Sequence, residues 1–275
     1  MTSESIFWNK HEARLRAGWR LAIQITLNIG LAVSLLALAV YFGGPLASQS
    51  PWSNVMVSLM FLGVTLLSVW SAGRFLDKRH FSDFGMLLNR RAWWADFAFG
   101  LALGSGLPVG LVLIALATGV ATLEPVFTSG MTSVPFVVAV LLSALAFTCI
   151  GTFEELARAY HVRNLLEGFN KGVGLKGAMV MAVMGASAVS VLMHRGNTAF
   201  LFYVLVSTVV KGLCYLLTSQ VAIAMAYHIA WDFVLESMMC FSVLTIVGKD
   251  KGDYRTGAYP DSEDFDFLPA FRAHL

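Results

Sequence analysis

Charged residues are scarce in this chain, and their scarcity sets its class. Only 13% of the 275 residues are charged, whereas 57% are hydrophobic and the mean hydropathy is +0.70. Soluble domains carry about a quarter charged residues and less apolar content. The composition therefore excludes a sizeable aqueous domain and predicts an integral membrane protein surrounded by membrane lipid. The formal net charge of +2 indicates no nucleic-acid partner.

Cysteine is almost as scarce. Cys149, Cys214 and Cys240 all lie inside apolar segments and show no C-x-x-C spacing. This number and spacing exclude a disulfide framework and a thiolate metal site. The three residues are predicted to be small core side chains.

Long apolar runs, by contrast, are frequent. A helix needs about 20 mostly apolar residues to cross the hydrocarbon core, and backbone groups facing lipid must pair within their own segment. We therefore predict an all-α, polytopic membrane protein of about seven or eight transmembrane helices with a polar intramembrane cavity. Seven spans are expected near residues 19–43, 53–73, 97–121, 135–155, 177–194, 198–218 and 220–247.

The placement of Lys and Arg predicts the orientation, because these residues collect in cytoplasmic connections. They are frequent in residues 1–18, 74–96 and 156–176 and absent from the connections that follow the first and third spans. We expect the basic N-terminus, residues 1–18, to be cytoplasmic, and the membrane to be a bacterial-type cytoplasmic membrane. The transmembrane domain is predicted to cover 19–247, and the acidic tail 248–275 to have little structure.

A small set of ionisable residues falls within the predicted spans. Burying such a group in a span costs on the order of 3 kcal/mol or more, so each suggests a function. The set consists of Glu154, Glu155, Arg158, His194, Lys211, His228, Asp232 and Glu236.

Three of these residues are spaced four apart. His228, Asp232 and Glu236 would form one stripe on an otherwise apolar helix, and such a stripe must face protein or water. A structural use is that Asp232 pairs with a neighbouring helix or orients His228. A catalytic use is equally compatible with the pattern.

Glu154 and Glu155 also permit two interpretations. Arg158 lies one turn further on and could pair with them at a membrane surface. A carboxylate beside an imidazole, however, is suited to general base catalysis on a water molecule. His194 is either an interfacial side chain or such an imidazole. Lys211 would need an acidic partner at mid-span, and we do not place it in the predicted site.

Three short motifs that contain these ionisable residues follow one another along the chain. They are E-E-L-A-R at 154–158, S-V-L-M-H at 190–194 and H-I-A-W-D at 228–232, the last preceded by K-G-L-C-Y-L-L-T-S-Q-V-A-I-A-M-A-Y. This pattern resembles the CPBP family, the CAAX protease and bacteriocin-processing (Abi) group of intramembrane proteases, which includes CAAX prenyl proteases and lysostaphin-resistance proteins. The resemblance covers about residues 74–247.

The resemblance implies roles for the residues of the motifs. Glu154 or Glu155 would activate a water together with His194, while His228 and Asp232 would steady the oxyanion or, in an older interpretation, bind a metal. Arg158 would orient the carboxylates. It follows the second Glu by three residues where the family pattern has four, so the identity of the base stays open between the two Glu residues.

A metal is the alternative to a glutamate mechanism. Glu154, His194, His228 and Asp232 include nitrogen and oxygen ligands suited to a divalent ion such as zinc. The chain has no H-E-x-x-H pairing, and the ligands would come from separate helices. We therefore favour a metal-free mechanism with no cofactor.

The paired use of Glu154 and His194 carries a geometric condition. With straight, full-length helices the two residues would lie near opposite membrane faces. A joint site requires the span 177–194 to be short or tilted, or the span 135–155 to continue beyond the membrane.

The predicted function is an intramembrane endopeptidase that cleaves a membrane-associated peptide or protein, either a CAAX-type prenylated substrate or a bacteriocin-like peptide. One alternative is a non-catalytic immunity or interaction protein with the same fold. A second is a proton-coupled transporter, which the absence of Gly- or Pro-broken repeated spans disfavours. Oligomeric state is not indicated.

Overall fold

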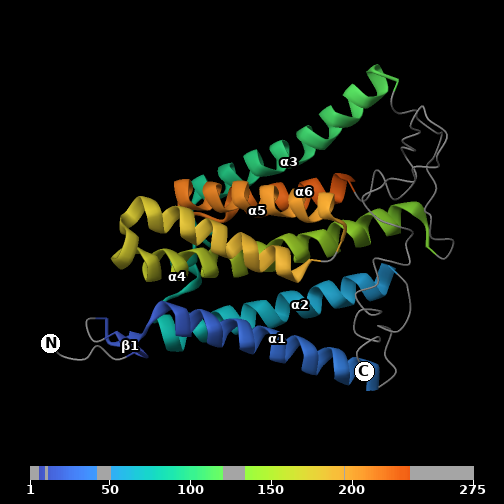
Figure 1. Ribbon diagram of the computed structural model, residues 1–275. Coiled ribbons are helices and arrows are strands. Elements are labelled where there is room, and N and C mark those ends of the chain that lie inside the picture. Colours follow the sequence, from blue (N-terminus) through green and yellow to red (C-terminus); the bar gives the residue numbers. More distant parts are fainter. Residues whose placement is uncertain (1–5, 10–11, 42–50, 120–133, 195, 236–275) are drawn as a thin grey trace.

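The chain folds almost entirely into helices (Figure 1). The computed structural model describes residues 6–9, 12–41, 51–119, 134–194 and 196–235. Two short strands, β1 (Trp8–Asn9) and β2 (Arg14–Leu15), pair antiparallel before the first helix. The helices are α1 (Ala17–Tyr41), α2 (Pro51–Ser71) with its π-helical continuation η2 (Ala72–Asp77), the 3-10 turn η3 (Phe81–Phe84), α3 (Arg91–Ala117), α4 (Phe136–Met193), α5 (Thr198–Thr218) and α6 (Ala222–Leu235).

Helix α4 consists of two limbs joined at Gly174. This residue has φ 70° and ψ 171°, a conformation that glycine adopts without the penalty of a Cβ atom. The limbs are antiparallel, since Leu165 of the first lies against Gly185 of the second. At 1.5 Å per residue the first limb is roughly 57 Å long, well beyond the hydrocarbon core of about 30 Å.

The prediction of an all-α membrane protein is confirmed. With the two limbs of α4 counted separately, each of the seven predicted spans coincides with a helical segment in the described part of the chain. Five helices there are long and apolar enough to cross a membrane, and α6 is a shorter apolar helix. The predicted span 220–247 is described only as far as 235, so Glu236, Cys240 and the tail 248–275 lie outside the described residues.

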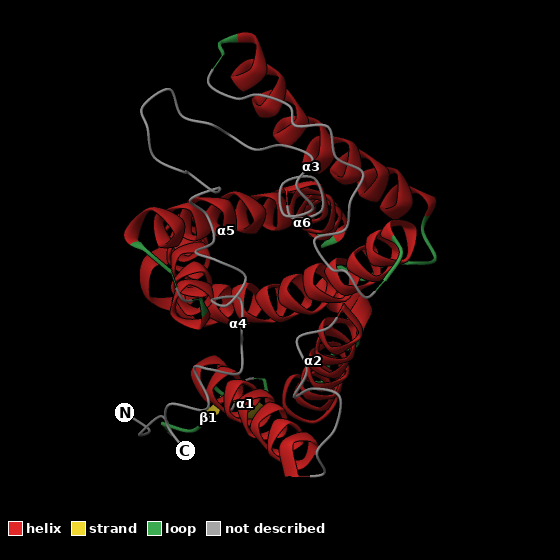
Figure 2. Cartoon of the chain, turned by 90° about the vertical axis from the view of Figure 1, so that its right-hand side faces the viewer, coloured by secondary structure: helices red, strands yellow, loops and turns green. Residues whose placement is uncertain are grey.

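Helix α4 is central to the arrangement. Figures 1 and 2 show α1 and α2 on one side of it and α5 and α6 on the other, with α3 lying outside α6. Large apolar side chains remain exposed along the helices, among them Leu111, Ile114 and Leu141. Exposed side chains of this kind suit a surface that faces lipid tails.

Glycines allow α6 to pack closely between α3 and α4. A Cβ atom on Gly104 of α3 would come within 2.4 Å of the Tyr227 carbonyl oxygen, and one on Gly151 of α4 within 2.5 Å of Ile229 Cγ1. Small residues let membrane helices approach closely enough for backbone contact. The glycines therefore set the depth at which α6 presents its polar side chains.

A second set of contacts ties α1 and α2 to α4. Gln24 of α1 donates to the Ser68 hydroxyl of α2 at 3.2 Å, and its amide oxygen lies 3.0 Å from His161 Nε2 of α4. Hydrogen bonds between buried side chains hold neighbouring helices together in a membrane. These contacts fix the face of α4 that is turned away from α5 and α6.

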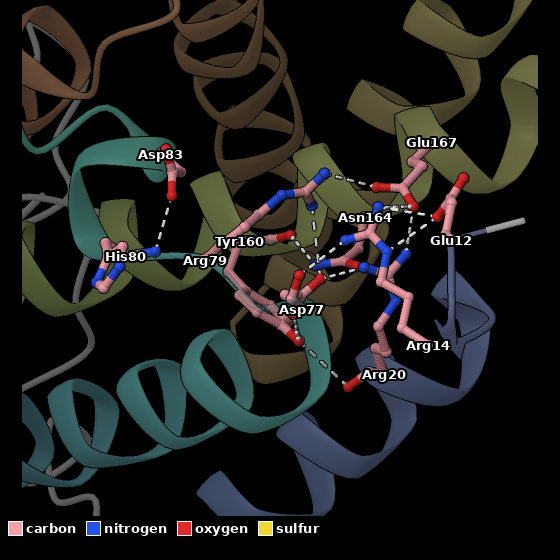
Figure 3. A network of polar contacts seen from close by, with 10 residues as sticks. All are labelled: Glu12, Arg14, Arg20, Asp77, Arg79, His80, Asp83, Tyr160, Asn164 and Glu167. Atoms are coloured by element: carbon pink, nitrogen blue, oxygen red, sulfur yellow. Dashed lines mark hydrogen bonds and ion pairs between the residues drawn. The ribbon is translucent and has the colours of Figure 1, made fainter. Parts of the chain in front are cut away.

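An ionic network lies at the ends of these three helices (Figure 3). Glu167 of α4 accepts from Arg14, Arg20 and Arg79 at 2.8, 2.6 and 2.8 Å, and the Tyr160 hydroxyl donates to Asp77 at 2.6 Å. Asp77 and Arg20 also form a buried ion pair. We call this set the polar junction, and its members are Arg14, Arg20, Asp77, Arg79, Tyr160 and Glu167.

The close contact between α3 and α6 gives a first prediction. Gly104→Ala places a methyl group against the backbone of Tyr227, so we expect a loss of about 1–3 kcal/mol in stability. The measurement is the thermal unfolding temperature of the detergent-solubilised protein. Gly106→Ala is the matched control, because among the described residues nothing beyond the adjoining backbone of its own helix lies within 4 Å of the added methyl group. Equal unfolding temperatures for the two variants would contradict the packing described here.

Candidate active site

Three helices bring a group of charged side chains together in the membrane region. The first limb of α4 contributes two Glu residues and an Arg, α5 contributes a Lys, and α6 contributes a His and an Asp. We call these residues the site cluster, and they are Glu154, Glu155, Arg158, Lys211, His228 and Asp232.

Glu155 is the centre of this cluster. Its carboxylate is buried, and one oxygen, Oε1, faces three donors. His228 Nδ1 lies 2.7 Å from it and Lys211 Nζ 3.3 Å from it, and Arg158 forms an ion pair with it. The Glu155 carboxylate thus joins α4, α5 and α6 through a single atom.

His228 lies between two carboxylates. Its Nδ1 faces Glu155, and its Nε2 is 3.0 Å from Asp232 Oδ2 one turn further along α6. Ionised carboxylates only accept hydrogen bonds. Both contacts can be hydrogen bonds only when both ring nitrogens carry a proton, so the arrangement favours an imidazolium ion at His228.

Glu154 has a different environment from its neighbour. Its side chain is 21% exposed, against 2% for that of Glu155. The nearest cationic atoms, Arg158 Nη2 and His228 Nε2, are both 3.9 Å from its Oε2, and among the described residues it makes no hydrogen bond through its side chain. Glu154 therefore has free lone pairs that a water molecule can reach.

His194 follows the second limb of α4 and lies outside the site cluster. Arg158 Nη2 donates to the Ser190 hydroxyl at 3.3 Å, so the antiparallel limbs place residue 158 opposite residue 190. One turn further on, the same pairing sets Glu154 level with His194. The first limb continues beyond residue 155 to Gly174, and a joint site of Glu154 and His194 stays a prediction.

The imidazole of His194 is held at one nitrogen. Its Nδ1 lies 2.8 Å from the Ser190 carbonyl oxygen, to which it must donate, and the ring contacts that of Phe200. In the neutral ring this leaves a lone pair on Nε2. Within the described part of the chain, no hydrogen bond or ion pair joins His194 to the site cluster.

Lys211 is the member of the cluster that the sequence did not place in the site. It is buried in the middle of α5 and reaches Glu155 across the helix interface. The available signal was its own position, since a lysine at mid-span requires an acidic partner. No sequence spacing could identify that partner, because it lies on another helix.

Whether the side chains predicted as possible metal ligands bind a metal ion stays a prediction. Both ring nitrogens of His228 face carboxylates. In the ranges that the structure describes, no group of three or more His, Cys, Asp or Glu side chains is placed to hold one.

Two cavities lie apart from the site cluster. One of about 300 Å³ is lined by residues of α2, η2 and η3, including Trp70, Arg74 and His80. The other, about 200 Å³, lies beside Arg163 and Tyr215. A polar cavity among α4, α5 and α6 stays a prediction.

A family model now agrees with the residues that carry this geometry. The model described as Type II CAAX prenyl endopeptidase Rce1-like matches residues 133–234. Over residues 133–234 the chain is thus similar to this CAAX protease family. No curated protein and no solved structure matches the chain.

The matched CAAX protease segment contains α4, α5 and α6 and therefore every member of the site cluster as well as His194. The match confirms the family indicated by the three motifs. It is narrower than the resemblance at about 74–247, and helices α1 to α3 lie outside it. The family assignment thus applies to the same three helices that build the candidate site.

The contrast between the two Glu residues gives a second prediction. Glu155→Gln removes the charge that offsets Arg158 and Lys211, so we expect a loss of about 3–5 kcal/mol in stability. Glu154→Gln should leave the unfolding temperature nearly unchanged, because Glu154 makes no close contact. Thermal unfolding in detergent measures both. A larger loss for Glu154→Gln would show that the roles are reversed.

Proposed function

We propose that this protein is an intramembrane endopeptidase. It hydrolyses a peptide bond of a membrane-associated substrate, either a CAAX-type prenylated chain or a bacteriocin-like peptide. The similarity of residues 133–234 to a CAAX protease family supports this activity. The observation that carries the mechanism is the difference between a buried Glu155 with close cationic partners and a partly exposed Glu154 whose nearest cationic atoms are 3.9 Å away.

Glu154 is the proposed general base. A base must be able to accept a proton from water, and Glu154 has the one carboxylate of the site cluster that is not engaged at close distance. His194 lies level with it on the opposite limb and has a free Nε2 when neutral. The two side chains would hold the attacking water between them.

The cationic part of the cluster would stabilise the charge that forms on the substrate. His228 Nε2 and Arg158 Nη2 both lie 3.9 Å from Glu154 Oε2, beside the proposed position of the water. Positive groups that are already in place at a developing oxyanion lower the barrier in a site with little water. Asp232 would orient His228 rather than contact the oxyanion, since an ionised carboxylate repels that charge.

Cleavage assays test this assignment directly. We expect Glu154→Gln and His194→Ala each to lower the rate of cleavage at least about 100-fold, because general base catalysis is worth about 10²–10⁴ in rate. The substrates are a prenylated peptide ending in a C-a-a-X sequence, its unprenylated counterpart and a bacteriocin-like precursor peptide. His80→Ala, which alters a residue outside the cluster, is the control. Full activity in both site variants would overturn the assignment.

Metal dependence has its own test. We propose a metal-free mechanism, so cleavage should continue at an unchanged rate after prolonged dialysis against EDTA. Loss of activity on dialysis, with recovery on adding Zn²⁺, would contradict it. The metal content of the purified protein, measured before and after dialysis, shows whether any bound metal was removed.

A further inference from the structure

Lys211 is a buried charge that the proposed mechanism does not use. Its side chain is 6% exposed, and it stands on α5 among apolar neighbours in the sequence V-S-T-V-V-K-G-L-C-Y. Burying an ammonium group is costly unless it is paired. Its Nζ lies 3.3 Å from Glu155 Oε1, but that oxygen already has close contacts with His228 and Arg158. Glu155 therefore does not by itself require a third cation.

The need for a third cation arises from the whole cluster. Glu154, Glu155 and Asp232 carry three negative charges when ionised. Arg158 and an imidazolium ion at His228 supply two positive charges. Without Lys211 the cluster would hold an excess negative charge within the membrane region, whereas with it the charges balance.

Asp232 is the carboxylate of the cluster whose charge is most simply tested. Its Oδ2 lies 3.0 Å from His228 Nε2, a contact that a neutral amide in the same position would also allow. Asp232 and Glu154 both act electrostatically on the Lys211 ammonium group, although Glu155 is its closest partner. Replacing Asp232 by Asn would therefore remove a charge and allow the contact with His228 to remain.

We propose that Lys211 is a positioning residue whose positive charge offsets that of Asp232, and that these two residues on α5 and α6 form a functionally coupled pair. An uncompensated negative charge would oppose the oxyanion formed during cleavage. The kinetic part of this inference rests on the proposed endopeptidase activity. The stability part depends only on the charges and contacts of the cluster.

The test is a double-mutant cycle with Lys211→Met, Asp232→Asn and the double variant. In the natural background we expect Lys211→Met to lower kcat about 100-fold with little change in KM, the size of effect seen when one oxyanion-stabilising group is lost. In the Asp232→Asn background the same change should lower kcat by less than about 10-fold. Lys211→Arg should recover most of the activity, because it keeps the charge.

Thermal unfolding of the same variants in detergent provides a readout that needs no activity. Lys211→Met should lower the unfolding temperature markedly in the natural background and much less in the Asp232→Asn background. Thr208→Val is the matched control on α5, because Thr208 is buried and bonded only to the Leu205 carbonyl. Its effect should be the same in both backgrounds.

The outcomes separate this inference from the proposed function. Coupling in the unfolding temperatures without detectable cleavage would support the charge pair and count against the endopeptidase. If the protein cleaves the substrate and Lys211→Met lowers kcat by the same factor in both backgrounds, the charge pair is overturned and the proposed endopeptidase activity is supported. If Lys211→Met fails to fold, folding of the double variant supports the pair, and failure of both overturns it.

Discussion

The buried carboxylate of Glu155 is the interaction on which the candidate site depends. In a membrane interior, opposite charges attract strongly because little water screens them, and an unpaired charge is correspondingly costly. Glu155 meets His228, Lys211 and Arg158 at one oxygen atom and so joins three helices. Since adjacent residues of a helix point about 100° apart, this hold on Glu155 leaves Glu154 at the edge of the cluster. Glu155 therefore stabilises the packing of the three helices, whereas Glu154 makes no contact closer than 3.9 Å with a cationic group.

That arrangement needs support from packing on both sides. Glycines of α3 and α4 allow α6 to sit deep between these helices, which brings His228 within reach of Glu155. The turn at Gly174 folds α4 back on itself, which brings His194 to the level of Glu154. Helix geometry and the absence of side chains at a few positions therefore decide where the charged groups meet.

The polar junction performs a comparable task at the ends of α1, η2 and α4. Arg79 belongs to a basic segment that predicts the orientation of the chain, and Arg20 lies just after another, yet both make ion pairs with carboxylates from distant parts of the sequence. Tyr160 adds a hydrogen bond to the same buried Asp77. The junction holds the first limb of α4 at Tyr160, less than two turns from Glu155, and at Glu167, so it also limits how that limb can move relative to α1 and η2.

Composition and apolar run length were enough to predict the membrane class, the all-α fold and the helical segments. In hydrocarbon a long apolar run must pair its own backbone N–H and C=O groups, and a helix does so. The order of the three motifs indicated the family whose model matches residues 133–234. Which side chains meet was decided only by the tertiary structure: the partner of Lys211, the different surroundings of Glu154 and Glu155, and the level of His194 all depend on helix rotation and on the turn at Gly174. Spacing within a helix shows which residues share a face, but contacts between helices depend on packing that no local pattern records.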